Sequence, residues 1–448
     1  MVTFLSLVGA APLAAQLPGD PFGGLVREGL DQNRALLQGR LGVGQRDLEV
    51  RRAKGALLPT LDFNGRYSEF EGIPDIGDYV NPAYAALNQL TGTSQFPTDV
   101  SQPLVFNQDV RFQATLPLFA PEAYANIALQ RSLREAEAGR LKAAERQVAA
   151  GVQLAALRIA IAERAASIYR EALELIDESL RVSERLVAAG TSTPDAVARS
   201  RADRSEAAQR LDEALRERND AVRALNELLR RPLDAEVPPL PDSLLAPAPA
   251  LDTVGALALA RERREELRAS RALERAAGAQ RRLASASFLP TVALAADYGW
   301  QGTELRFTND NDFVAGSVVL RWNLFNGGRD DARRQLATLE QRRTALATEE
   351  ATAGVEREVL NALDATATAW RAIATADDRL AASERTWQLV RRRYEEGLAP
   401  HLELSDARTQ YTTAELNAAL QRFTYAARLV ELERVTGARE LGGDDDAR

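Results

Sequence analysis

Apolar and small residues recur along one long stretch of the chain at alternating steps of four and three. From Val355, this spacing selects Val359, Ala362, Thr366, Ala369, Ile373, Ala376, Leu380, Ser383, Trp387, Val390 and Tyr394. A mean spacing of 3.5 residues over several turns predicts a helix that supercoils against its neighbours. The same pattern begins 207 residues earlier, at Val148, and continues to Val187. The chain therefore contains two copies of one long helix, which indicates two fused halves.

Each long helix is followed by a short turn and a second helical segment. The turns, at 190–194 and 397–401, contain Gly and Pro, which suit a helix end and a helix start. The sequence thus predicts two antiparallel hairpins, each about 100 Å long at 1.5 Å per residue. The first long helix has a second apolar line, which predicts partners on two sides and a wall of helices rather than a solid bundle. That line consists of Leu154, Leu157, Ile161, Ile168, Leu175 and Val182.

Four shorter segments alternate between apolar and polar residues with a period of two. In the first segment Leu61, Phe63 and Tyr67 alternate with polar residues, and similar segments cover 110–116, 292–300 and 318–324. This alternation predicts four strands, each with one apolar and one polar face. The connection over 71–108 is aperiodic and rich in Gly, Pro and Asn, so we expect a long exposed loop there. The connection over 301–311 is much shorter.

The strands occupy the same place in both halves. A helix expected over 22–56 ends at Leu57-Leu58-Pro59-Thr60, and one expected over 251–286 ends at Phe288-Leu289-Pro290-Thr291. The first residues are apolar and end in small residues, as in an export signal, although a basic start is missing and a merely apolar N-terminus is the alternative. The expected organisation is a signal peptide over 1–17, a first repeat over 18–231, a Pro-rich linker over 232–250, a second repeat over 251–437 and a disordered tail over 438–448.

Composition narrows the classes of function. The net charge is −8, which disfavours nucleic acid as a partner. There is no Cys and a single His, His401, so a thiolate nucleophile, a Cys-based metal site and a multi-His metal site are excluded. No nucleotide-binding motif stands at a strand-to-helix junction. We expect no enzyme activity, no cofactor and no metal.

The number of strands has a consequence for assembly. Charged residues make up 27% of the chain, and after the first 17 residues no run is long and apolar enough for a transmembrane helix. Amphipathic strands can span a bilayer only in a closed barrel, and the smallest such barrels have about eight strands. Four strands are too few, so several chains would have to share one barrel. The fold class predicted is an α+β membrane protein with long coiled-coil hairpins.

The order of these features resembles the TolC family of outer-membrane efflux proteins. Each half has an LP-T turn into a strand, a strand ending in a Leu-Phe turn, a long helix, a Gly-containing tip and a returning helix. The Leu-Phe turns are Leu118-Phe119-Ala120-Pro121, where Gly is usual, and Leu324-Phe325-Asn326-Gly327-Gly328-Arg329, which is typical of the family. The resemblance implies a homotrimer with twelve strands in one outer-membrane barrel, continuous with an α-helical tunnel through the periplasm.

The resemblance also implies a function and partners. The chain would be a passive outer-membrane duct in lipid, fed by an inner-membrane pump through a periplasmic adaptor. Both would dock at the hairpin tips, which contain Gly190, Thr191, Pro194, Gly397, Pro400 and His401. An alternative with the same architecture is the exit duct of a type I protein secretion system, and an alternative of another class is a periplasmic coiled-coil scaffold. The sequence leaves the cargo open.

Glu403 and Asp406 resemble the family's acidic pair at the closed entrance. Because they are three residues apart, they share a helical face, and a trimer would present six carboxylates around one axis. The simpler interpretation is that they complement the dipole at the start of a helix. We expect residues of the first tip to pair with Glu403, Asp406 or Tyr394 across neighbouring hairpins. The candidates for gate pairing are Asp195, Arg199, Arg201, Tyr394 and Arg408. His401 is expected to be solvated at an exposed tip.

Overall fold

The computed structural model describes residues 22–70, 75–101, 106–190, 193–237 and 252–439. The predicted signal peptide at 1–17, Thr191, most of the Pro-rich linker and nearly all of the C-terminal tail lie outside these ranges. The chain divides into two compact units. One unit, which we call the helical unit, contains Met1–Gly44, Glu135–Ala272 and Ala345–Arg448; the other, the sheet unit, contains Gln45–Arg134 and Leu273–Thr344. Each unit therefore contains segments from both predicted repeats.

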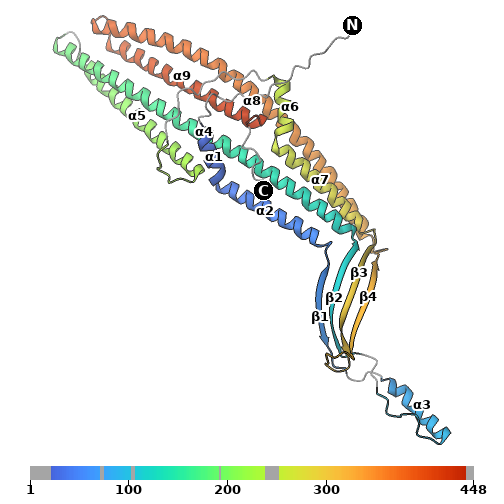
Figure 1. Ribbon diagram of the computed structural model, residues 1–448. Helices are drawn as coiled ribbons and strands as arrows, with labels where there is room; N and C mark the ends of the chain where they lie inside the picture. Colours follow the sequence, from blue (N-terminus) through green and yellow to red (C-terminus); the bar gives the residue numbers. More distant parts are fainter. Residues whose placement is uncertain (1–21, 71–74, 102–105, 191–192, 238–251, 440–448) are drawn as a thin grey trace, which may run out of the picture. The chain divides into compact units, whose positions relative to one another are not determined.

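The sheet unit is built around four antiparallel strands in the order β1-β2-β3-β4 (Figure 1). They are β1 (Thr60–Tyr67), β2 (Gln108–Phe119), β3 (Thr291–Gly302) and β4 (Asp312–Arg321). The register aligns Phe63 with Phe112, Phe112 with Tyr298 and Tyr298 with Val314. Since side chains alternate between faces along a strand, these apolar residues share one face of the sheet. The predicted four amphipathic strands are confirmed, and β1 and β4 are the two edges.

A helix occupies part of the β1–β2 connection, where the sequence predicted an aperiodic loop. This helix, α3 (Ile76–Thr91), begins with a capping box formed by Asp75 and Asp78. The prediction of a loop was wrong because the Asn residues of this segment do not break the helix. The side chains of Asn81 and Asn88 instead bind the backbone of the chain that returns beside it, at Val100 and Phe96.

Two long hairpins make up most of the helical unit, and the first residues of the long helix in each hairpin belong to the sheet unit. The first is α4 (Pro121–Ala188) followed by α5 (Pro194–Leu229), and the second is α8 (Arg329–Glu395) followed by α9 (His401–Thr436). The 68 residues of α4 correspond to about 100 Å at 1.5 Å per residue. Both predicted seams are buried or half-buried along their whole length. Among the described residues, none of the helices combines the length and the apolar character of a membrane span.

The helices that precede β1 and β3 are each broken once. Two single helices were expected, but the structure has α1 (Gly23–Gln32) and α2 (Arg34–Gly55) in the first half, and α6 (Thr253–Arg263) and α7 (Glu265–Ala286) in the second. Asn33 ends α1, and its side-chain oxygen accepts from Ala35 N and caps α2. Arg264 ends α6 in extended conformation. The two breaks lie at equivalent positions relative to Pro59 and Pro290.

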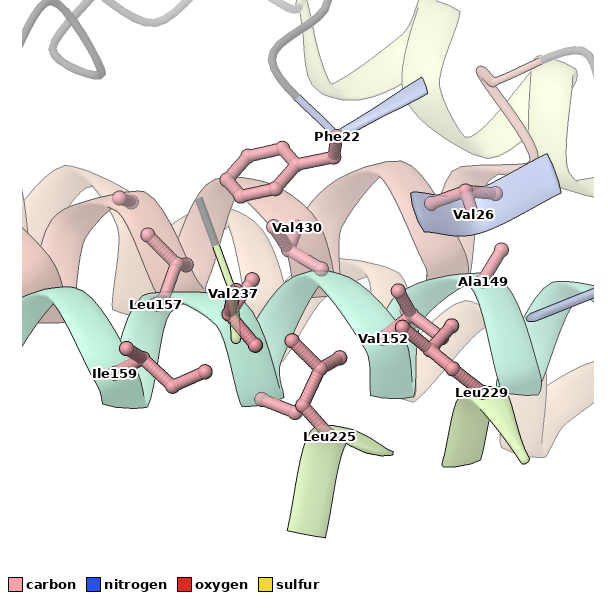
Figure 2. Packing of buried hydrophobic residues seen from close by; sticks show 14 of the residues in the cluster. Phe22, Val26, Ala149, Val152, Leu157, Ile159, Leu225, Leu229, Val237 and Val430 are labelled. Atoms are coloured by element: carbon pink, nitrogen blue, oxygen red, sulfur yellow. The ribbon is translucent and has the colours of Figure 1, made fainter. Parts of the chain in front are cut away.

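The largest apolar cluster of the helical unit surrounds the middle of α4. Figure 2 shows Leu225 and Leu229 of α5 lying against α4, and Val152 and Leu229 are fully buried. Residues from α1 and α9, including Val430, belong to the same cluster. The long helix thus contacts several helices of its unit. This arrangement agrees with the two apolar lines in its sequence.

Candidate functional site

A short connection joins the two helices of each hairpin at its tip, and Thr191 and Ser192 of the first connection lie outside the described residues. Gly190 and Gly397 have φ of +72° and +74°, the left-handed conformation that favours Gly at a helix end. Pro194 is the first residue of α5, and Pro400 precedes α9. Leu398 and Leu402 are 66% and 64% exposed at the second tip. The second tip therefore exposes apolar side chains on the surface of the chain.

Beneath the tips, the two hairpins pack against each other through an apolar cluster. Trp387, Val390 and Tyr394 of α8 and Leu404 of α9 are buried there, and Val182 of α4 packs against them. Three of these residues, Trp387, Val390 and Tyr394, are the last members of the predicted seam. The seam therefore continues to the tips and joins the first hairpin to the second.

A chain of polar contacts crosses this apolar cluster. The hydroxyl groups of Ser183 and Tyr394 are 2.8 Å apart, and those of Ser183 and Ser200 are 3.3 Å apart. Ser200 Oγ is in turn 3.4 Å from His401 Nε2. Each of the four side chains is buried. These contacts join one side chain from each of the four helices α4, α5, α8 and α9. Because the side chains are buried, their hydrogen bonds are stronger than they would be in water.

The prediction that His401 is solvated was wrong. Its ring is buried and lies edge-on to Tyr394, with ring centroids 5.8 Å apart. The residue is the first of α9, so its side chain turns back onto the cluster below the tip rather than outward. Burial lowers the pKa of His401 from its ordinary value, because desolvation disfavours the charged imidazolium. The side chain is therefore neutral at pH 7.

A buried ion pair lies next to the polar contacts of Ser183, Ser200, Tyr394 and His401. Arg408 Nη2 of α9 donates to Asp203 Oδ2 of α5 at 2.7 Å, and the Arg408 side chain is only 5% exposed. Ser405 Oγ donates to the same carboxylate at 2.6 Å. Burial by itself would raise the pKa of Asp203, but the hydrogen bonds from Ser405 and Arg408 outweigh it and the pKa is lowered. The carboxylate is thus held in its charged form.

The two predicted gate carboxylates have different surroundings. Glu403 is half-buried and accepts from Arg393 Nη1 at 2.9 Å, across the turn of the same hairpin. Asp406 is exposed and accepts from Gln410 Nε2 at 3.2 Å. Among the described residues, Asp406 has no cationic partner within salt-bridge distance. The free negative charge of the pair is therefore concentrated on Asp406.

The predicted pairing residues divide into two groups. Tyr394 and Arg408 do join the hairpins, but they do so through Ser183 and Asp203. The other three contact neighbours in their own hairpin: Asp195 lies 3.6 Å from Arg199, and Arg201 lies 3.3 Å from Glu184. Within one chain they do not contact Glu403 or Asp406. Pairing between neighbouring chains stays a prediction.

Four residues of this site were missed in the sequence: Ser183, Ser200, Asp203 and Ser405. Ser183 gave a signal, because it is a polar residue at a position of the first seam that is otherwise apolar. Asp203 and Ser405 gave none, since they contact each other over a separation of about 200 residues. Such contacts depend on how the hairpins pair and not on any local pattern.

The comparisons with known proteins agree with this architecture. Residues 256–438 match the family model described as outer membrane efflux protein. Among solved structures, the chain is similar to the channel CusC, with 18% identity, a TM-score of 0.79, and coverage of 96% of this chain and 95% of that one. No curated protein sequence matches.

Two further solved structures have the same fold. The outer membrane protein VceC from Vibrio cholerae is 17% identical, with a TM-score of 0.77 and coverage of 92% of this chain and 95% of that one. The outer membrane channel MtrE from Neisseria gonorrhoeae is 22% identical, with a TM-score of 0.73 and coverage of 92% and 88%. The resemblance noted in the sequence is therefore confirmed: residues 256–438 match the model of the outer membrane efflux proteins, and the described chain has the fold of these solved channels.

Proposed function

We propose that this chain is the outer-membrane channel of a tripartite efflux system, through which small molecules leave the cell passively. The observation that carries the proposal is an exposed apolar face on the four-stranded sheet. Phe63 is 63% exposed, Val314 80% and Val318 68%, although all three lie in regular strands. A face of this kind is costly in water and is the lipid-facing surface expected of a membrane barrel.

The opposite face of the sheet has the character of a water-filled lumen. Asn64 pairs in register with Arg111, and Asp62 pairs with Gln113, which pairs with Asp297. These residues alternate with the apolar ones, so they share the other face. A polar interior under an apolar exterior is the pattern of barrels that conduct water and solutes.

The open edges of the sheet support a shared barrel. In one chain β1 and β4 each have a neighbour on one side only, and unpaired backbone groups are not tolerated in hydrocarbon. A homotrimer would provide twelve strands, in which β4 of each protomer pairs with β1 of the next. The long hairpins would then continue the duct into the periplasm as a tunnel.

The hairpin tips fit the role of a docking surface for the periplasmic adaptor and, through it, the inner-membrane pump. The exposed Leu398 and Leu402 supply apolar contacts next to Gly397 and Pro400. Across the three-fold axis, Asp406 and Glu403 would form a ring of carboxylates at the entrance, with Asp406 supplying most of its charge. Such a ring would attract cations and would repel itself when the entrance narrows.

The experiment that tests this proposal measures the mass and symmetry of the detergent-extracted protein. Native mass spectrometry should give three copies, and electron-microscopy class averages should show a hollow three-fold particle with a rod below the micelle. A protein that fractionates as soluble without detergent, or that forms a solid rod, would refute the channel. That result would favour the periplasmic scaffold instead.

A further inference from the structure

The helix α3 has two different faces, and within the described part of the chain only one of them is covered. Gly77, Asn81, Tyr84 and Asn88 recur at steps of four, three and four, and they lie against the returning segment at 93–101. Asn81 exchanges two hydrogen bonds with Val100, of 2.8 and 2.9 Å. At Gly77 a Cβ atom would lie only 1.8 Å from the carbonyl oxygen of Val100. The helix and its returning segment thus form a closely packed finger.

The other face of α3 is apolar and open. Ile76, Tyr79, Ala83, Ala86 and Leu90 recur at steps of three, four, three and four. At 100° per residue this line lies roughly opposite the covered one. Tyr79 is 70% exposed and Leu90 84%, and Ala83 and Ala86 are also exposed. The spacing is that of a coiled-coil seam, in which each helix packs against another with the same repeat.

The charge of this connection decides between the possible occupants. From residue 67 to residue 110 there is no Lys, Arg or His, and there are six acidic residues. Helices that lie on a membrane surface carry Lys and Arg on their polar face, which anionic lipids attract. The finger has the opposite charge, so a lipid surface is disfavoured. The seam itself carries no charge and can pack against an uncharged seam.

We propose that the apolar face of α3 binds the α3 helices of the other protomers at the outlet of the channel. This inference rests on the trimer of the proposed function. The helix follows β1, which is an edge strand and would lie at a boundary between protomers. A 16-residue helix associates weakly on its own, but three copies tethered to one barrel meet at high effective concentration. The partner surface is thus a second copy of the same seam.

Cysteine crosslinking tests this contact directly, because the natural chain has no Cys. In the full-length protein extracted in detergent, Ala86→Cys places a thiol on the seam. Ala85→Cys is the matched control, because it has the same residue type and is also exposed, but lies 100° around the helix. A disulfide needs Cα atoms about 4.4–6.8 Å apart, so after mild oxidation we expect a linked dimer for Ala86→Cys and none for Ala85→Cys.

The mass of each oxidised sample separates the two levels of the proposal. Trimers in which Ala86→Cys crosslinks no better than Ala85→Cys would overturn the α3 contact and leave the proposed function standing. Particles that contain one chain only would overturn both. Ala83→Cys, on the same seam one turn earlier, should behave like Ala86→Cys. If only one of the two seam positions formed dimers, a chance collision of loops would explain the result and the seam would be rejected.

Discussion

The ion pair between Asp203 and Arg408 makes the sharpest prediction about how the two hairpins are held together. Asp203→Ala removes a carboxylate that lies 2.7 Å from the guanidinium. Arg408 would keep only Ser405, whose hydroxyl is 3.4 Å away, and its Nη1 already lacks a partner. The variant therefore leaves a buried positive charge without compensation.

The size of this effect follows from the burial of the two side chains. Breaking a fully buried pair costs about 3–5 kcal/mol. Asp203 is 24% exposed, so water can partly replace it, and we expect a loss of about 2–3 kcal/mol. At about 1.4 kcal/mol for each factor of ten, this corresponds to a local opening about 30 to 140 times more frequent.

Hydrogen–deuterium exchange of the detergent-extracted protein measures this opening. Peptides from the tip regions of α5 and α9 should lose protection by that factor, whereas peptides from the middle of α4 should not change. Asp195→Ala is the matched control, because Asp195 and its partner Arg199 are 64% and 57% exposed. An exposed pair contributes about 0–1 kcal/mol, so this variant should change the exchange by less than about fivefold.

A double variant distinguishes the unpaired charge from lost packing. Asp203→Ala combined with Arg408→Met removes both charges, and replacing a buried ion pair with apolar groups is often neutral. We therefore expect most of the lost protection to return. If the double variant exchanged as fast as Asp203→Ala, or if Asp195→Ala had the same effect as Asp203→Ala, the reasoning from the buried charge would be refuted.

Three further predictions concern the sheet, the entrance and the response to pH. Gly299→Ala should destabilise the assembled particle by about 1–3 kcal/mol in thermal unfolding, because its Cβ would lie 2.3 Å from the backbone oxygen of Val110. Gly316→Ala is the control and should not destabilise it, because a Cβ there would have no atom within 4 Å. Asp406→Ala should reduce the cation preference of single channels in planar bilayers, and an unchanged reversal potential would contradict the ring. Because burial lowers the pKa of His401, the unfolded state binds more protons below about pH 6.5, and stability falls as the pH falls. Thermal unfolding at pH 7.5 and 5.5 should show this loss, and His401→Gln should have a smaller one, since it removes the only His.

The strands and the long helices could be predicted from the sequence because each has one apolar face, whose residues recur at a regular spacing. Leu61, Phe63 and Tyr67 alternate because one face of β1 is apolar, and the seam from Val355 to Tyr394 is apolar or small because it is packed. The signal is local and repeated many times. It also appears twice, once in each half, so that each copy supports the other.

The helix α3 was missed, although an apolar line from Ile76 to Leu90 in it has a helical spacing. Its covered face is formed by Gly77, Asn81, Tyr84 and Asn88, so the residues that pack against the chain are mostly polar or small. Hydrogen bonds from the Asn side chains do what apolar contacts do elsewhere. The Gly, Pro and Asn residues of this segment indicated a loop, although the Asp75–Asp78 capping box marks a helix start.

The candidate site was predicted in part for a similar reason. The turns at Gly190 and Gly397 are visible because a left-handed residue favours Gly. The partners of Tyr394 and Arg408 were not visible, because Ser183 and Asp203 belong to the other hairpin. Their contacts arise only when the two halves pair, and no spacing within either half encodes them.

The two halves share their seam but differ where the polar contacts are made. Tyr394 of the second half corresponds to Val187 in the seam of the first half. Ser183 of the first half corresponds to Val390 in the seam of the second half. Each half therefore has an apolar residue where the other has the polar one, and the two polar residues bind each other at 2.8 Å. Apolar side chains could fill these positions without the cost of burying hydroxyl groups. A polar pair in an apolar seam instead specifies one register between helices, which here aligns the tip of the first hairpin with the tip of the second.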